Sequence, residues 1–288
     1  MAIELITKVS GNVDEIFATE SKKSILTNTD YSWTGAHTIK INKVNTVGMN
    51  DYDRTGEKVG TGSGSSVIWS RYGAIGKVEN TLEEMTLTKD RSFTFVIDKM
   101  DKDETDAALS GASALARQQR EVIIPEVDSY TYGVMAANAG TKVTNVTLTP
   151  DNIYDEIIKA TTVLDDNDVP DMGRVLTIVP AVYQMLKKSA DLQIDCDITA
   201  EQKAKGVIGM IDGMNIVKIP SKRMPKNAGF MIAHPVATVA PTKLEEYKIH
   251  QDPPGISGEL VEGRIVYDAF VLDNKKMAIY YEENKPAE

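Results

Sequence analysis

The chain has 288 residues, of which 42% are hydrophobic and 26% are charged, and its formal net charge is −10. This composition is typical of a folded globular protein with one large or two modest domains and argues against wholesale disorder. The acidic balance argues against a protein that grips nucleic acid through its phosphates, because such binding needs a concentrated basic surface.

Residues 1–36 are polar and weakly periodic, and Val13, Ile16 and Phe17 suggest at most a short helix. Nothing at the start of the chain has the basic opening and small-residue cleavage site of a secretory signal, so we expect none. A segment of this kind has little of its own to bury. We therefore expect an arm that needs a partner surface to become ordered.

The next stretch, residues 38–98, is typical of β-structure interrupted by a long excursion. Residues 38–42 and 92–98 alternate with period two, which predicts strands. We expect a hairpin closed by residues 89–91, with these side chains sharing its faces: Met85, Leu87, Phe93, Phe95 and Ile97. The excursion, residues 48–76, is rich in glycine and serine, and a loop of this length indicates function or disorder.

Aromatic residues occur on this excursion, where the loop alone offers little to bury them. They either fold back onto their own subunit or pack on a neighbouring molecule, and the second interpretation is favoured because Tyr and Trp are enriched at interfaces. The weak arm and the long loop together indicate a subunit whose surface only assembly can cover. The candidate inter-subunit contact residues are Tyr52, Arg54, Lys58, Trp69, Arg71, Tyr72 and Lys77.

Residues 103–139 predict one long helix with acidic residues in its first turn, a kink at Pro125 and a stop at Gly140. Its apolar stripe, broken only by the glutamine, is expected at Ala112, Ala116, Gln119, Ile123, Val127, Tyr130 and Val134. A helix this long exceeds the globular average several-fold, so we expect it to cross a flat or extended body.

A second helix is predicted to begin at Thr149, with Pro150 in its first turn. Its expected buried residues are Ile153, Ile157, Ala160 and Leu164. A buried strand at residues 175–179, a helix at 181–189 and short strands near 214–219 and 229–234 follow. The last prediction is a hairpin of residues 264–272 and 277–281 joined by a turn at 273–276. The whole is α+β.

No pattern in the chain points to a chemical site. The tract at residues 60–66 lacks the lysine and hydroxyl residue of a phosphate loop, and the acidic run at 165–171 has the wrong spacing for a calcium loop. The single cysteine, Cys196, excludes an intramolecular disulfide and fits a reducing cytosol. The histidines, His37, His234 and His250, have no paired metal-ligand spacing. We therefore expect no catalytic residue, cofactor or metal site, with an enzyme whose site is unrecognised as the alternative.

Several blocks of the chain, taken in order, resemble the major capsid proteins of tailed bacteriophages. The blocks are residues 87–93, 97–105, 121–132, 164–174, 179–183 and 267–275. The resemblance implies the Hong Kong 97-type capsid fold. It further implies an N-terminal arm (1–37), an extended β-loop with flanking strands that lies over an adjacent subunit (38–99), a peripheral domain with the spine helix (100–164), an axial domain (165–255) and a C-terminal hairpin of the peripheral domain (256–288).

The function implied by the resemblance is that of a major capsid protein, a late structural protein that assembles into pentamers and hexamers of an icosahedral shell around double-stranded DNA. The implied partners are copies of the chain, portal and scaffolding proteins, a decoration protein, and DNA bound without sequence specificity, with no membrane. Because no charged helical extension precedes the arm, a separate scaffold or none is implied. The implied location is the virion capsid, and the host cytoplasm before assembly. The alternatives are an encapsulin-like compartment shell and another virion structural protein, such as a tail-tube subunit.

Overall fold

The computed structural model describes residues 20–31, 33, 38–62, 67–68, 70–104, 110–189 and 207–285. The chain divides into two compact units, one formed by residues 1–34 and 88–288 and the other by residues 35–87. Predictions that concern Val13, Ile16, Phe17, His37 and Cys196 lie outside the described residues.

The core of the larger unit is a mixed six-stranded sheet with strand order β4-β13-β8-β5-β7-β6. Its two central strands, β5 (Val175–Ile178) and β8 (Ala228–Ala233), are buried along their whole length, as expected for strands covered on both faces. The outer strands are β4 (Thr141–Val146), β13 (Ile279–Asn284), β7 (Met214–Lys218) and β6 (Val207–Ile211).

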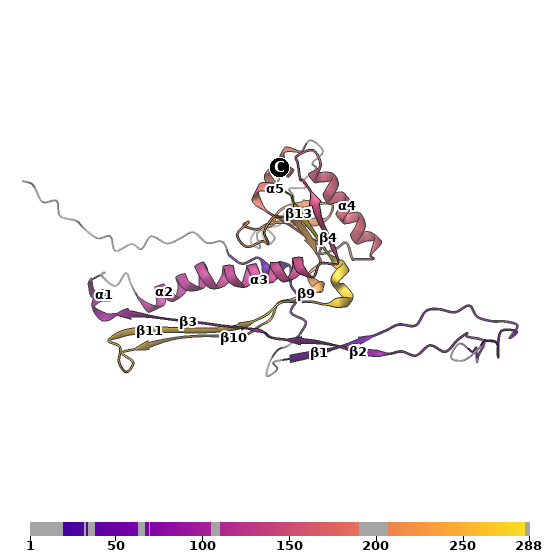
Figure 1. The fold of residues 1–288 in the computed structure, drawn as a ribbon, viewed down its shortest axis with the longest axis horizontal. Helices are drawn as coiled ribbons and strands as arrows, with labels where there is room; N and C mark the ends of the chain where they lie inside the picture. The colour runs from indigo at the N-terminus through magenta and orange to yellow at the C-terminus, as the bar shows by residue number, and fades with distance from the viewer. Residues whose placement is uncertain are drawn as a thin grey trace, which may run out of the picture. The chain divides into compact units, whose positions relative to one another are not determined.

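Two helices pack against this sheet, α4 (Ile153–Asp166) and α5 (Pro180–Lys188), and Figure 1 shows them beside β13 and β4. The predicted buried face of α4 is confirmed: Ile153, Ile157, Ala160 and Leu164 are at most 1% exposed. The predicted start at Thr149 is wrong by a few residues, because the helix begins at Ile153. The amide oxygen of the Asn152 side chain instead accepts a hydrogen bond from the Thr149 N–H, which closes a turn ahead of the helix.

A second sheet of the larger unit carries the long helix on one face. Its strands are β10 (Thr242–Gln251), β11 (Gly258–Tyr267) and β3 (Lys89–Asp98), all antiparallel. Ion pairing and ring contacts join it to the helix: Arg91 pairs with Glu126 at 2.7 Å, and the rings of Tyr130 and Tyr267 meet edge to face at 5.7 Å. Figure 1 shows the helix running along these strands.

The predicted helix at 103–139 is partly wrong. Its N-terminal part is a separate short helix, α1 (Lys99–Glu104), and the long helix begins at Gly111, where the hydroxyl of Ser110 accepts a hydrogen bond from the Ser113 N–H. From there it continues as α2 (Gly111–Gln118), a π-helical turn η3 (Gln119–Ile123) and α3 (Ile124–Ala137).

The π turn lies directly before Pro125 and changes which residues face the sheet. The Ile124 N–H reaches back five residues to the carbonyl of Gln119. A π turn holds one residue more than an α turn. The residues of α2 that face the sheet are therefore shifted by one position from those that a continuous 3.6-residue period would place there. Ala112 and Ala116, predicted to be inward, are therefore exposed, whereas Gly111 is buried against Glu259. On α3 the prediction holds for Val127, which is 7% exposed.

The two hairpins predicted from neighbouring strands do not form. Strand β2 (Asn80–Thr86) pairs with β1 (Thr38–Val44) in the smaller unit, while β3 pairs with β11. At the C-terminus, β11 lies in the three-stranded sheet and β13 in the six-stranded sheet. The segment between them holds β12 (Phe270–Val271), which pairs with β9 (Thr238–Val239), and the 3-10 helix η5 (Asp273–Ala278).

Candidate assembly surfaces

The smaller unit continues beyond β1 and β2 as a loop whose two limbs stay in contact. The Asn45 N–H donates to the Glu79 carbonyl at 3.0 Å, and farther out the side-chain amide of Asn50 donates to the Ala74 carbonyl at 3.2 Å. The Asp53 N–H donates to the Arg71 carbonyl at 2.9 Å. The limbs thus continue the β1–β2 pairing without regular strand structure, and Figure 1 shows them side by side.

Glycines allow this close approach. A Cβ atom on Gly76 would lie 2.4 Å from a methyl carbon of Val47, and one on Gly73 would lie 2.6 Å from the Cβ of Asn50. Both separations are shorter than real Cβ contacts, so a side chain at either glycine requires the opposite side chain or its limb to shift. At Gly48, by contrast, a Cβ would meet nothing within 4 Å.

A carboxylate organises the loop near its tip. The carboxylate of Asp53 accepts hydrogen bonds from the N–H groups of Lys58, Gly56 and Thr55, at 2.8, 2.9 and 3.2 Å, and from the hydroxyl of Thr55 at 3.0 Å. These bonds favour the charged form, chiefly the one from the Lys58 N–H, and hold the pKa of Asp53 below its usual range. Gly56, at the turn, has a φ of +77°, a conformation that favours glycine.

The smaller unit exposes many large apolar side chains. Met49 is fully exposed, and Tyr72 and Ile75 are 78% and 75% exposed. The others are Val44, Val47, Tyr52, Val59, Val78 and Leu82. A concentration of exposed large apolar side chains of this kind is typical of interaction sites in soluble proteins.

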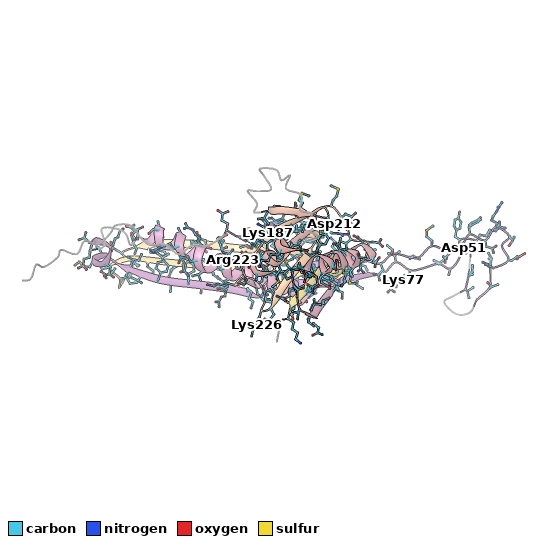
Figure 2. All side chains as sticks on the ribbon, turned by 90° about the horizontal axis from the view of Figure 1, so that it is seen from above. Asp51, Lys77, Lys187, Asp212, Arg223 and Lys226 are labelled. Atoms are coloured by element: carbon cyan, nitrogen blue, oxygen red, sulfur yellow. The ribbon has the colours of Figure 1, made fainter. Side chains whose placement is uncertain are left out.

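The structure places the predicted contact residues along this loop, and Figure 2 shows Lys77 and Asp51 on its limbs. The rings of Tyr52 and Tyr72 meet edge to face, with centroids 5.1 Å apart. Lys58 and Arg71 belong to the Asp53 turn through their backbone groups, Arg54 is exposed, and Lys77 lies 3.7 Å from Glu79. Trp69 lies outside the described residues.

Sequence reasoning missed Asp53, Gly73, Gly76, Met49 and Ile75. The only signal for the glycines was their frequency, which does not reveal which of them lies against the opposite limb. Asp53 resembles any polar loop residue until the four donors around it are known.

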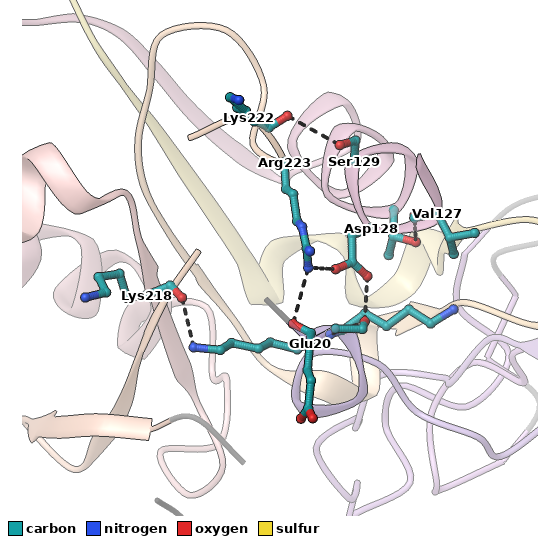
Figure 3. A network of polar contacts seen from close by, with 11 residues as sticks. Glu20, Val127, Asp128, Ser129, Lys218, Lys222 and Arg223 are labelled. Carbon is teal, nitrogen blue, oxygen red and sulfur yellow. Dashed lines mark hydrogen bonds and ion pairs between the residues drawn. The ribbon is translucent and has the colours of Figure 1, made fainter. Parts of the chain in front are cut away.

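A second feature of functional interest is how residues 20–28 are attached to the rest of the larger unit (Figure 3). The guanidinium of Arg223 donates to the Asp128 carboxylate at 2.9 Å and to the Glu20 carbonyl at 3.2 Å, and the hydroxyl of Ser21 donates to Asp128 at 2.6 Å. Asp128 and Arg223 are 1% and 6% exposed. A buried charge pair of this kind is costly to break, because either partner left alone is an uncompensated buried charge.

Leu26, just beyond this network, is fully buried in the core, and the Asn28 N–H donates to the Thr238 carbonyl at 2.9 Å. The expectation that residues 1–36 have little of their own to bury is therefore wrong for residues 20–28. No sequence pattern links residues 20 and 21 with 128 and 223.

The described residues contain no group of three His, Cys, Asp or Glu side chains that could hold a metal ion. A groove of about 620 Å³ is lined by residues of β3, α1, β10 and β11, including Glu259. That carboxylate is already held by Lys102 at 2.6 Å and by the Gly111 N–H at 2.6 Å. No helix in the described part of the chain combines the length and the apolar character needed to cross a bilayer.

Comparison with known proteins then decides the family. The model of the family described as phage capsid protein matches residues 81–281, more than half of the chain. The chain belongs to the phage capsid protein family. This confirms the resemblance drawn from the sequence, and it makes the chain a structural protein of the bacteriophage virion. No curated protein sequence matches the chain.

Solved structures agree on the fold of this capsid protein. A chain from Mycobacterium phage Che8 superposes with a TM-score of 0.73 at 18% identity, covering 98% of this chain and 97% of that one. The capsid of cyanophage P-SCSP1u gives 0.71 at 14% identity, covering 96% and 92%. The mature capsid of bacteriophage PhiM1 gives 0.70 at 15% identity, covering 98% and 93%. The predicted α+β capsid fold of the Hong Kong 97 type is thereby confirmed.

Proposed function

We propose that this capsid protein is the major shell subunit, which assembles with copies of itself into pentamers and hexamers of an icosahedral capsid that encloses double-stranded DNA. The observation that carries the proposal is the exposed apolar surface of the smaller unit, with nine large apolar side chains among the described residues of 44–82. A monomer gains nothing from such a surface, whereas a neighbouring copy can bury it.

The proposed mechanism is energetic. The loop of one copy and a different surface of the next form a heterologous contact, and such contacts close into rings. Each contact can be weak, because a subunit held by several neighbours at once is retained through effective concentration. The family match supports a phage shell over the compartment and tail-tube alternatives.

The proposal extends to the roles of the chain's parts. Residues 1–37 are the arm, 38–99 the extended β-loop with its flanking strands, 100–164 and 256–288 the peripheral domain, and 165–255 the axial domain. Portal, scaffolding and decoration proteins are the proposed additional partners. DNA is the proposed cargo, held without sequence-specific contacts, and assembly is proposed to start in the host cytoplasm.

Deletion of residues 52–72 tests the proposal. The limbs are adjacent there, since the side-chain amide of Asn50 reaches the Ala74 carbonyl, so an Asn-Gly turn can join the cut ends. The shortened subunit should unfold thermally as the full chain does but form no shells in electron microscopy. The control carries Gly48→Ala in the full-length loop, which meets no atom, and should form isometric shells. Normal shells from the deletion variant would contradict the role given to the loop, and an unmodified chain that forms no shells would contradict the shell function.

A further inference from the structure

The loop of the smaller unit has two independent structural supports, which lie at different distances from β1 and β2. Partway along, the limbs touch where Gly73 and Gly76 lack side chains, and a Cβ there would lie only 2.6 and 2.4 Å from Asn50 and Val47, respectively. Near the tip, one carboxylate gathers three backbone N–H groups and a hydroxyl. Beyond that turn the Gly60 N–H donates to the Ile68 carbonyl at 2.7 Å, and the Ile68 N–H donates to the Thr61 carbonyl at 3.0 Å.

These contacts all lie within residues 45–79, so none of them needs a partner molecule in order to form. A loop that folded only on binding would lose affinity to the entropy of ordering its residues at that moment. A loop that is already folded avoids this cost. It also leaves Met49, Tyr72 and Ile75 exposed to a partner.

We propose that the loop docks as a preformed finger, and that Asp53 and Gly76 are the positioning residues that hold its conformation before a second copy of the chain is bound. This inference rests on the proposed function, because the second copy is the partner assigned there. Asp53 acts through the backbone N–H groups that donate hydrogen bonds to its carboxylate. Gly76 acts because it has no side chain, which leaves room for the side chain of Val47 on the opposite limb.

The charge state of Asp53 is consistent with this role. The N–H donors, led by that of Lys58, hold its pKa below the usual range. A group with a depressed pKa contributes its stabilisation above the pKa of the unfolded chain and loses it as the pH falls through the depressed value. At neutral pH the Asp53 carboxylate is therefore in the charged form that accepts these hydrogen bonds.

The experiment compares Asp53→Ala, Asp53→Asn, Gly76→Ala and Gly48→Ala with the unmodified chain. The first readout is the rate of tryptic cleavage after Arg54, Lys58 and Arg71 in subunits kept below their assembly concentration, which reports how often the loop opens. The second readout is shell yield by sedimentation and electron microscopy at equal concentration. Thermal unfolding of each variant shows whether the larger unit is intact.

We expect Asp53→Ala and Gly76→Ala to raise the cleavage rate roughly tenfold and to lower shell yield. Asp53→Asn keeps an acceptor oxygen, so its cleavage rate and its shell yield should both lie between those of Asp53→Ala and the unmodified chain. Gly48→Ala should match the unmodified chain, because the added methyl group meets nothing within 4 Å. An ordered series in which cleavage and assembly change together supports the inference.

Two outcomes would overturn it. In the first, the variants are cleaved faster but assemble like the unmodified chain, so preformation is irrelevant to docking. In the second, cleavage is equally fast in all of them, so Asp53 and Gly76 hold nothing in place. Neither outcome touches the proposed shell function, which fails if the unmodified chain forms no shells.

Discussion

Glu282, at the middle of β13, is a fully buried carboxyl group in the core of the larger unit. The hydroxyl of Tyr280 donates to one of its oxygens at 3.1 Å, while its other oxygen has no hydrogen-bond partner within the described residues. Glu156 on α4 adds a like charge, and Lys159, paired with Glu156 at 2.7 Å, offsets it in part. Burial is the main cause that raises the pKa of Glu282 to about 7.

This raised pKa predicts a pH-dependent stability. The folded chain holds the proton more tightly than the unfolded chain, whose carboxyl has its ordinary value of 4.5. The stabilisation is complete below about 4.5, falls as the pH rises, and is gone above about 7. Glu282→Gln, which is neutral at every pH, should remove a fall on the order of 2–3 kcal/mol in the free energy of unfolding between pH 5 and pH 8.

Denaturant unfolding at a series of pH values measures this effect. Glu104→Gln is the matched control, since Glu104 is exposed at the end of α1 and its replacement should leave the pH profile unchanged. If Glu282→Gln and the unmodified chain give parallel profiles, the carboxyl does not bind its proton near neutral pH in the fold.

At the scale of elements, local patterns predicted where strands and helices lie but not how they associate. The strands at 38–42, 92–98 and 175–179 all form, because alternation and burial are properties of a short segment. Their partners are set by contacts far apart in the chain, as in the pairing of β3 with β11 across more than 150 residues. A hairpin is the simplest prediction for two strands that are neighbours in the sequence. It was wrong both for the turn at residues 89–91 and for the turn at residues 273–276.

The long helix shows a second limit of pattern analysis. A period of 3.6 residues assumes that every turn is an α turn, so the π turn at Gln119–Ile123 moved the predicted face of α2 by one residue. Pro125 was visible in the sequence and predicted a disturbance. The disturbance takes the form of a widened turn ahead of the proline, where an α turn would bring the proline ring against the carbonyl of residue 121.

We therefore expect that one residue of this π turn can be deleted if Pro125, which requires the wider turn, is replaced at the same time. Deleting Arg120, which is exposed, in a Pro125→Ala background should convert η3 to a regular α turn and leave the faces of α2 and α3 where they are. The free energy of unfolding should fall by less than about 2 kcal/mol. The control deletes Lys159, also exposed, from the regular helix α4.

The Lys159 deletion rotates Ile153 and Ile157 away from the sheet relative to Leu164, so its cost should exceed about 3 kcal/mol. Equilibrium unfolding in urea measures both deletions. Equal costs for the two would show that η3 does not accommodate an extra residue.

At the scale of the whole molecule, the sequence indicated assembly because the arm and the loop carry surface that one subunit cannot bury. In the structure, exposed large apolar side chains are concentrated in the smaller unit. The N-terminal segment is different, because residues 20–28 are attached to their own subunit through Arg223, Asp128 and the buried Leu26. These contacts join positions about 100 and 200 residues apart, which no local pattern reveals. The N-terminal segment and the loop of the smaller unit looked alike in the sequence. Residues 20–28 of the segment contact their own subunit, whereas the loop leaves its large apolar side chains exposed.

The exposed apolar side chains of the loop should affect the concentration at which shells form. Met49, Tyr72 and Ile75 are the most exposed large apolar side chains among the residues of the loop that the structure describes. Replacing all three by serine removes apolar contact without emptying a core. Each buried side chain of this size contributes about 1.5–3 kcal/mol before the cost of ordering is subtracted. With about 1 kcal/mol retained for each, the critical concentration for assembly should rise roughly 100-fold, since 1.4 kcal/mol corresponds to a factor of ten.

Light scattering against protein concentration measures this threshold, and thermal unfolding should be unchanged because none of the three residues is buried. The control is Met172→Ser, on the turn between α4 and β5, where the side chain is 88% exposed. It removes a comparable apolar side chain from a different part of the surface, so its threshold should remain near that of the unmodified chain. An unchanged threshold for the triple variant would mean that neighbours in the shell leave the apolar surface of the loop uncovered.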